Sequence, residues 1–187
     1  MNELAALLRA AVADAMRQAN TCLPGKVVSY DAATQTATIQ PLLKTRQPDG
    51  REEALPPLSG VPVVFPRGGG GAITMPMREG DGVMLTFSQR SLDEWKGKGG
   101  EQTPDDPRML DMSDAIATPG MVDAEAGGGP SDCIELRLGG AKVQIFEDKV
   151  LIVAGTVRFE GEVEIDGNVK IWGDAEATGN FNSEEPL

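Results

Sequence analysis

The 187 residues are enough for one core of about 100 to 150 residues and an appendage, and the 23 glycines and 13 prolines disfavour long helices. A net charge of −12 and a pI of about 4.4 oppose binding to nucleic-acid backbones and to anionic membranes, because like charges repel. Cys22 and Cys133 form no CxxC motif and histidine is absent, so neither a disulfide framework nor a zinc site is indicated.

Residues 1–20 are predicted to form an amphipathic helix. Leu4, Leu8 and Val12 recur at helical spacing, whereas Arg9 lies off that stripe. Such a stripe has to pack either on the following domain or on a partner, and the sequence leaves both open. No apolar run approaches eighteen residues and no basic segment precedes one, so neither an export signal nor a membrane span is expected. Synthesis in the cytoplasm is therefore expected.

From Leu23 the period of the apolar residues changes to two, which predicts β-strands. Five short strands are expected, at residues 25–30, 36–42, 61–65, 72–75 and 82–87. Five antiparallel strands over about 65 residues fit a small barrel of the OB type better than a sandwich of about seven. Residues 89–130 are predicted to be loops with one helical turn near 111–115. We assign residues 21–125 to an OB-fold domain with a loop extension.

The segment AEAGGGPSD has the composition of a flexible hinge, and we place a domain boundary within it. Beyond it, CIELRLGG, AKVQIFEDK and VLIVAG alternate apolar and polar residues between glycine or aspartate turns. These segments predict short strands that lead directly into a repeat. Residues 126–187 therefore form the third predicted domain.

The repeat consists of five six-residue units (hexads), GTVRFE, GEVEID, GNVKIW, GDAEAT and GNFNSE. In the first three, the third and fifth positions are apolar and the others mainly polar, so each hexad predicts a short strand with one apolar face and a glycine corner. The predicted core residues are Val157, Phe159, Val163, Ile165, Val169 and Ile171. The predicted corners are Gly155, Gly161, Gly167, Gly173 and Gly179.

A strand of this kind cannot bury its apolar face alone, so the hexads have to stack. If one chain formed a three-sided β-helix, thirty residues would give fewer than two coils. Three identical chains that each contribute one edge per hexad would instead share a core, and five hexads would build a rod of roughly 24 Å at ~4.8 Å per strand. We therefore predict a mainly β protein that ends in an intertwined trimeric β-helix, or β-prism.

Two other functions were weighed against a mechanical one. A hexapeptide-repeat transferase with a left-handed β-helix would require several coils and a histidine base, and an OB module that binds nucleic acid would require a basic aromatic face. RGGGGA at residues 67–72 lacks the Lys-Ser or Lys-Thr of a phosphate loop and predicts a hairpin loop. No nucleophile stands beside a base. We predict no enzymatic activity, no catalytic residue, and no cofactor or metal site.

Three segments carry a resemblance to a known family: LPGKVVSYDAATQTATIQPLL, LPPLSGVPVVFPRGGGGAITMPMREGDGVMLTFSQRSLDEWKGKGG and DPRMLDMSDAIATPGM. They resemble the N-terminal region of baseplate central-spike proteins (baseplate assembly protein V-like) of contractile-tailed bacteriophages, over about residues 23–121. FSQRSLDEW and DMSDAIATPG are the more distinctive parts, and the hexads agree with the β-helical spike of that family. The resemblance implies a homotrimer in the tail baseplate of the virion. Its OB-fold collar would attach to tail hub proteins, and its needle would pierce the host outer membrane when the sheath contracts.

The end of the sequence departs from this family. Several family spikes end in a histidine-containing apex that binds an iron ion, and because this sequence has no histidine, no apical iron is expected. In the last hexads Ala175 and Ala177 replace larger residues, and the estimated rod is shorter than a hydrocarbon core of about 30 Å. We therefore expect a separate tip protein as a partner, with a shortened chain or a blunt end as the alternatives.

Overall fold

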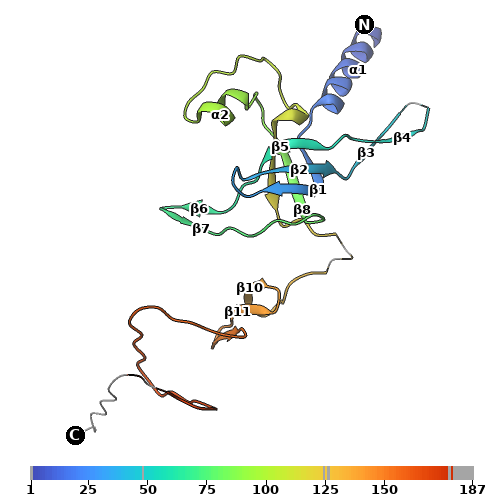
Figure 1. The fold of residues 1–187 in the computed structure, drawn as a ribbon. Coiled ribbons are helices and arrows are strands. Elements are labelled where there is room, and N and C mark those ends of the chain that lie inside the picture. Colours follow the sequence, from blue (N-terminus) through green and yellow to red (C-terminus); the bar gives the residue numbers. More distant parts are fainter. Residues whose placement is uncertain (1, 48, 124, 126, 177, 179–187) are drawn as a thin grey trace. The chain divides into compact units, whose positions relative to one another are not determined.

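The structure is a computed structural model that describes residues 2–47, 49–123, 125, 127–176 and 178. It divides into two compact units, Met1–Gly128 and Gly129–Leu187. We describe each unit by itself (Figure 1).

The first unit begins with helix α1, Asn2–Gln18, as its apolar spacing predicts. Its stripe is not covered by the rest of the described chain: Leu4 is 66% exposed, Leu8 57% and Val12 58%. Of the two possibilities that the sequence leaves open, packing on the following domain is therefore not observed. Among the described residues, no helix combines the length and the apolar character needed to cross a bilayer.

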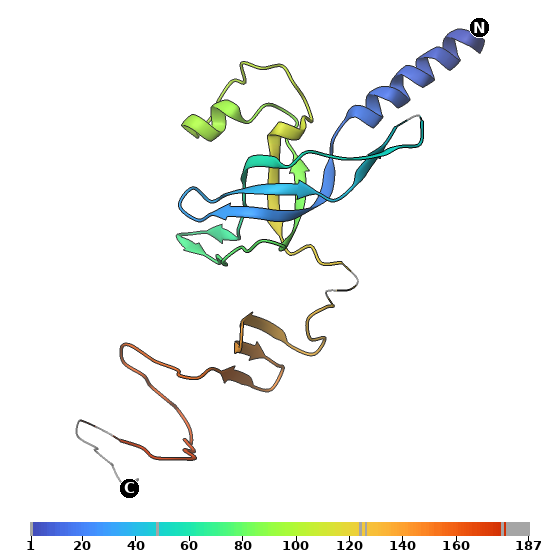
Figure 2. The ribbon, with the colours of Figure 1, turned by 45° about the vertical axis from the view of Figure 1, so that its right-hand side comes forward.

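A five-stranded sheet in the order β5-β2-β1-β8-β9 forms the body of this unit, and all its neighbouring strands are antiparallel. In chain order its strands are β1 Cys22–Asp31, β2 Thr36–Pro41, β5 Leu58–Pro62, β8 Gly82–Phe87 and β9 Ala115–Pro119. The sheet curls, so that its two outer strands approach each other (Figures 1 and 2). A parallel bridge pairs Val63 with Ala117, and the Val64 N–H donates to the Ala117 carbonyl at 2.9 Å. The result is a half-barrel whose edges meet.

The concave side of this sheet is the hydrophobic core. Alternate residues of β2 and β8 are buried, as the two-residue period predicts, because successive side chains of a strand point to opposite faces. The core residues are Val27, Ala37, Ile39, Val61, Val63, Phe65, Val83, Leu85, Phe87, Ala115 and Ala117. The strands expected at residues 25–30, 36–42 and 82–87 are thus confirmed, whereas the one expected at 61–65 is displaced, because β5 both begins and ends three residues earlier, at Leu58 and Pro62.

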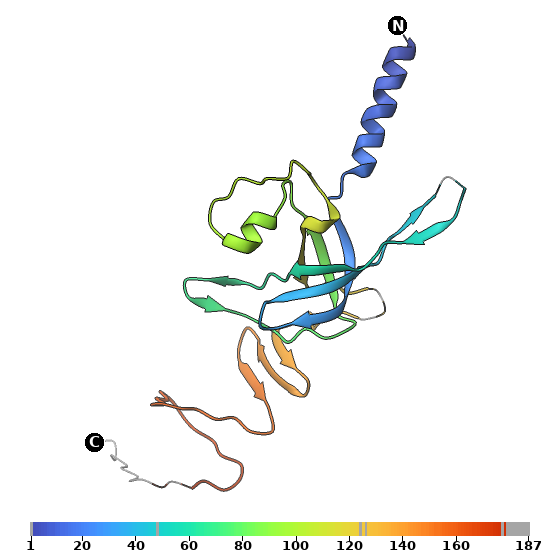
Figure 3. The same cartoon turned by 45° about the horizontal axis from the view of Figure 1, so that its top comes forward.

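Two hairpins extend from the sheet (Figure 3). One joins β3, Lys44–Arg46, to β4, Glu52–Ala54, and the other joins β6, Arg67–Gly68, to β7, Gly71–Ala72. The second hairpin contains RGGGGA, and its two turn glycines have φ of 56° and 85°, as a tight hairpin turn requires. The hairpin prediction for this segment is confirmed. The strand expected at residues 72–75 is wrong, because pairing ends at Ala72.

The segment between β8 and β9 contains more structure than its glycine, proline and aspartate content indicates. It includes the short helix α2, Asp93–Lys98, and the 3-10 turn η1, Met112–Asp114, of which only the turn was expected. Strand β9 was missed, since AIATP at Ala115–Pro119 contains only two residues of high β-propensity, Ile116 and Thr118, and ends in a proline.

The second unit contains a three-stranded antiparallel sheet, β10 Ile134–Leu138, β11 Ala141–Ile145 and β12 Val150–Val153. These strands confirm the alternation in CIELRLGG, AKVQIFEDK and VLIVAG. Residues 154–176 follow without an assigned strand in this single chain. The trimeric β-helix therefore stays a prediction.

Candidate functional site

The apolar positions of the hexads form the first candidate site. In the single chain every predicted core residue is exposed, although each is a large aliphatic or aromatic side chain. The exposed fractions are Val157 47%, Phe159 68%, Val163 57%, Ile165 62%, Val169 60% and Ile171 62%. Solitary apolar residues at a surface are ordinary, whereas these six recur at a fixed alternation within fifteen residues and are all exposed in the single chain.

The hexad glycines repeat one backbone conformation. Gly161, Gly167 and Gly173 have φ of 124°, 139° and 137°, in the range that residues with a Cβ rarely adopt. Gly155 does not share this conformation, and Gly179 lies outside the described residues. Three successive hexads thus change direction at the same position of the repeat.

A buried ion-pair cluster joins the two most distinctive segments of the collar sequence. Asp114 is fully buried, and its carboxylate accepts from Arg108 Nε at 2.7 Å and from Arg108 Nη2 at 2.9 Å. It also accepts from the Leu92 N–H at 2.8 Å. Asp93 and Asp106 bind the outer side of the same guanidinium at 2.7 and 2.9 Å. FSQRSLDEW and DMSDAIATPG are therefore held together through one arginine.

The electrostatics of this cluster favour its charged form. Burial alone raises the pKa of the Asp114 carboxyl, but hydrogen bonds from Arg108 and the Leu92 N–H, with the positive charges of Arg108 and Lys96, leave that pKa below its ordinary value. Hydrogen bonds to Asp114, and then to Asp93 and Asp106, raise the pKa of Arg108. These contacts fasten the segment between β8 and β9 at the buried Asp114 carboxylate.

Sequence reasoning missed this cluster. The sequence pattern alone singles out none of Asp106, Arg108 and Asp114. The available signal was the placement of one arginine among four aspartates in DDPRMLDMSD, within a segment that the resemblance had marked as distinctive.

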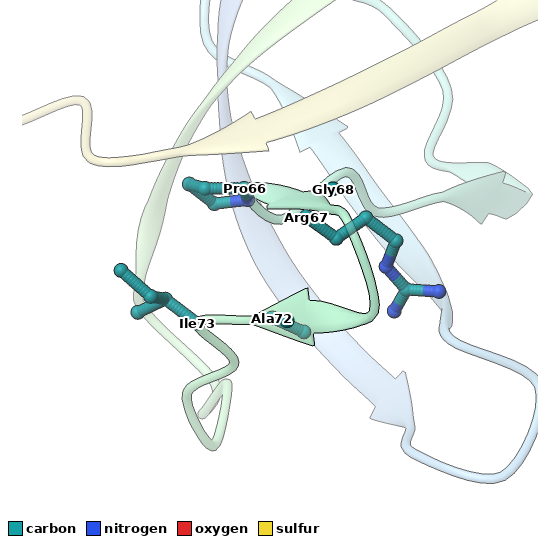
Figure 4. A pocket seen from close by; sticks show the side chains of 6 residues that line it. Pro66, Arg67, Gly68, Ala72 and Ile73 are labelled. Atoms are coloured by element: carbon teal, nitrogen blue, oxygen red, sulfur yellow. The ribbon is translucent and has the colours of Figure 1, made fainter.

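The loop of the β6–β7 hairpin borders a shallow, open hollow lined by Pro66, Arg67, Gly68, Gly71, Ala72 and Ile73 (Figure 4). The Arg67 guanidinium donates to Gln35 Oε1 at 2.7 Å, so its charge is directed at a neighbouring loop. No helix follows the glycines to offer its N-terminus to a phosphate. The strand-glycine-helix geometry of a phosphate loop is therefore not seen at this hollow.

A half-barrel fastened by an ion-pair cluster, followed by exposed repeats, defines a β-rich structural protein. Residues 23–120 match the family described as phage protein Gp138 N-terminal domain. Because this match covers just over half of the 187 residues, the chain belongs to that family. It is a bacteriophage structural protein of the baseplate type and is located in the virion. Comparison with curated proteins gave no match.

Proposed function

We propose that this protein is the homotrimeric central spike of a contractile tail baseplate. Residues 21–125 form the collar that attaches to the tail hub, and residues 126–187 form a shaft that pierces the host outer membrane when the sheath contracts. Its role is mechanical, and no step requires a catalytic group. An acidic exterior, with a net charge of −12, keeps such a rod soluble.

The strand order of the collar supports an OB-fold. The order β5-β2-β1-β8-β9, together with the bridge from Val63 to Ala117, places five strands around a partly open barrel. Strands β2 and β5 follow each other in the sheet and pair antiparallel, whereas β8 pairs with β1 on the other side of the sheet. The segment after β5 then bridges to β9 and closes the barrel. This Greek-key path in a five-stranded barrel is the description of the OB-fold.

The exposed hexad faces are the observation on which the proposal depends. Burying a side chain the size of valine or isoleucine contributes ~1.5–3 kcal/mol, so six per chain supply roughly 9–18 kcal/mol to an association. That is comparable to the estimated cost of ~4–15 kcal/mol for lost translational and rotational freedom. A single chain of this length cannot close a β-helix of its own, whereas three chains around one axis bury all three apolar faces together.

The alternative, a hexapeptide-repeat transferase, has no specific support: the sequence has no histidine to act as the base. The same absence leads us to propose that no apical iron is bound by this chain. A separate tip protein would then complete the shaft beyond the weaker hexads.

The oligomeric state of the full chain tests this function. Light scattering should give the mass of three chains for the wild type, and Val163→Asp should reduce it because three carboxylates would be buried near the axis. Glu164→Lys is the matched control: it changes the neighbouring polar position, by two units of charge, and should leave the mass unchanged. A monomeric wild type would exclude the shared shaft.

The position of the protein in the particle is a second test. Electron microscopy of tails carrying a tagged chain should place the tag on the axis, at the distal end of the baseplate. A peripheral position would contradict the spike.

A further inference from the structure

The three-stranded sheet of the second unit has one apolar face that nothing in the described chain covers. The register pairs Leu136 with Val143 and Val143 with Ile152, so all three lie on this face. Its full set is Ile134, Leu136, Leu138, Ala141, Val143, Ile145, Val150 and Ile152. Only Val143, on the central strand, is half-buried; Ile134 is 68% exposed and Leu138 63%.

The opposite face of the same sheet is mixed: it carries the polar residues of β10 and β11 together with two apolar residues of β12, namely Glu135, Arg137, Lys142, Gln144, Leu151 and Val153. Gln144 donates to Glu135 at 2.7 Å and is 8% exposed, and Arg137 pairs with Glu135 at 3.4 Å. A face that carries internally paired polar groups is stable in water, whereas a wholly apolar one is not. The sheet therefore has a defined inside and outside, and its inside requires a partner.

Both edges of this sheet are open. The order is β10-β11-β12, and within residues 127–176 no further strand pairs with β10 or β12 (Figure 2). The edge strand β12 reads VLIV and carries no charge or proline, the devices by which proteins protect an edge from pairing. Because β10 and β12 are both antiparallel to β11, they run in the same direction.

We propose that three copies of this sheet close into one nine-stranded barrel, with β12 of each copy paired in parallel with β10 of the next. The inference rests on the proposed homotrimer and states how the chains join ahead of the hexads. With threefold cyclic symmetry, the β12 edge of each sheet pairs with the β10 edge of the next copy, so no edge strand stays unpaired. Eight apolar residues from each of three chains then fill the interior, which suits a barrel near eight strands, whose lumen side chains can fill.

The size of the sheet favours this closure over a pair of sheets packed face to face. Two strands of five residues and one of four cover at most ~14 by ~17 Å, or about 240 Å² in projection. A specific, stable interface buries about 800 Å² on each partner. A face-to-face dimer of this sheet is therefore too small, whereas the closed barrel adds backbone hydrogen bonds along three edges.

Cysteine pairing in the full chain tests the barrel. In a Cys22→Ser, Cys133→Ser background, Leu136→Cys is combined in turn with a cysteine at each position from 150 to 153. Within one chain β10 and β12 lie two strand spacings apart, ~9.6 Å, which is too far for a disulfide between directly opposed residues. We expect oxidation to give covalent dimers and trimers at one or two of the four positions, and only monomers for Leu136→Cys alone.

A second pair of variants tests which face is inside. Ile152→Asp, or Val150→Asp where position 152 carries the cysteine, should abolish the cross-link, because either change places three carboxylates in the interior. Leu151→Asp on the outer face, or Val153→Asp where position 151 carries the cysteine, should preserve it. A trimer by mass that cross-links at none of the four positions would overturn the barrel and leave the proposed spike intact. Preserved cross-linking in Ile152→Asp would also overturn the barrel. A monomeric wild type would instead overturn the homotrimer and this inference with it.

Discussion

Replacing Asp114 tests whether the buried ion-pair cluster holds the collar together. The fully buried carboxylate of Asp114 accepts two hydrogen bonds from Arg108 and one from the Leu92 N–H. Asp114→Ala removes one member of a buried ion pair and leaves the Leu92 N–H unpaired, which we expect to cost about 3–5 kcal/mol. At about 4 °C per kcal/mol for a domain of this size, the midpoint of thermal unfolding should fall by roughly 12–20 °C.

Two further variants separate the buried charge from the hydrogen bonds. Asp114→Asn keeps the volume and an acceptor for the Leu92 N–H, so we expect a smaller loss of about 1–3 kcal/mol. Asp93→Asn changes a carboxylate whose side chain is 62% exposed and that contacts only the outer side of Arg108. Exposed ion pairs contribute at most about 1 kcal/mol, so this control should unfold close to the wild type.

Far-UV circular dichroism of the full chain, at equal protein concentration, measures all three variants, since unfolding of an oligomer depends on concentration. The predicted order of midpoints is wild type, Asp93→Asn, Asp114→Asn, Asp114→Ala. An Asp114→Ala midpoint within about 3 °C of the wild type would refute the assigned role, because ~1 kcal/mol is less than any buried pair of this geometry should contribute.

The remaining predictions concern pH, one close backbone approach and one hexad corner. The pKa of Asp114 in the folded protein lies below its unfolded value of about 3.9, so its contribution to folding stability is present above that pH and is lost in acid. The difference in unfolding midpoint between wild type and Asp114→Asn should therefore shrink from pH 5 to about pH 3. A difference that widens over this range would contradict the prediction. Gly82→Ala should lower the midpoint of thermal unfolding by several degrees, because the new Cβ would lie 2.0 Å from the Met121 carbonyl oxygen. The control is Gly97→Ala in α2, whose Cβ would meet nothing within 4 Å and which should be neutral or stabilising. Gly167→Val should weaken the trimer on dilution, as followed by light scattering, because φ of 139° is strained for a branched residue; an unchanged dissociation curve would show that the corner is not required.

Sequence periodicity predicted the strands in which residues of two kinds alternate. In β2 and β8 every second residue is buried, and in β10 and β11 apolar and polar residues alternate, so the positions of these strands could be read directly. Strand β9 could not, because two of its buried positions are the alanines Ala115 and Ala117, which carry little hydrophobic signal. Burial there is imposed by the strands on either side and not by local propensity.

The ion-pair cluster escaped prediction for a related reason. Arg108 and Asp114 are near neighbours in sequence, but the burial of Asp114 depends on Leu92 from a segment twenty-two residues earlier. Composition shows many aspartates and cannot tell which one is enclosed. The hexads present the converse case: their pattern is clear from the sequence, while in the single chain their predicted core residues are exposed.

The bridge between Val63 and Ala117 determines when, during translation, the half-barrel can close. The half-barrel cannot close until β9 has left the ribosome, but once it has, every core strand of the collar is available. Synthesis at ~5–20 residues per second takes about 3–10 s more to reach Ile171, the last of the apolar hexad positions. In the proposed trimer, the apolar hexad faces through which the chains associate thus leave the ribosome after all five strands of the half-barrel.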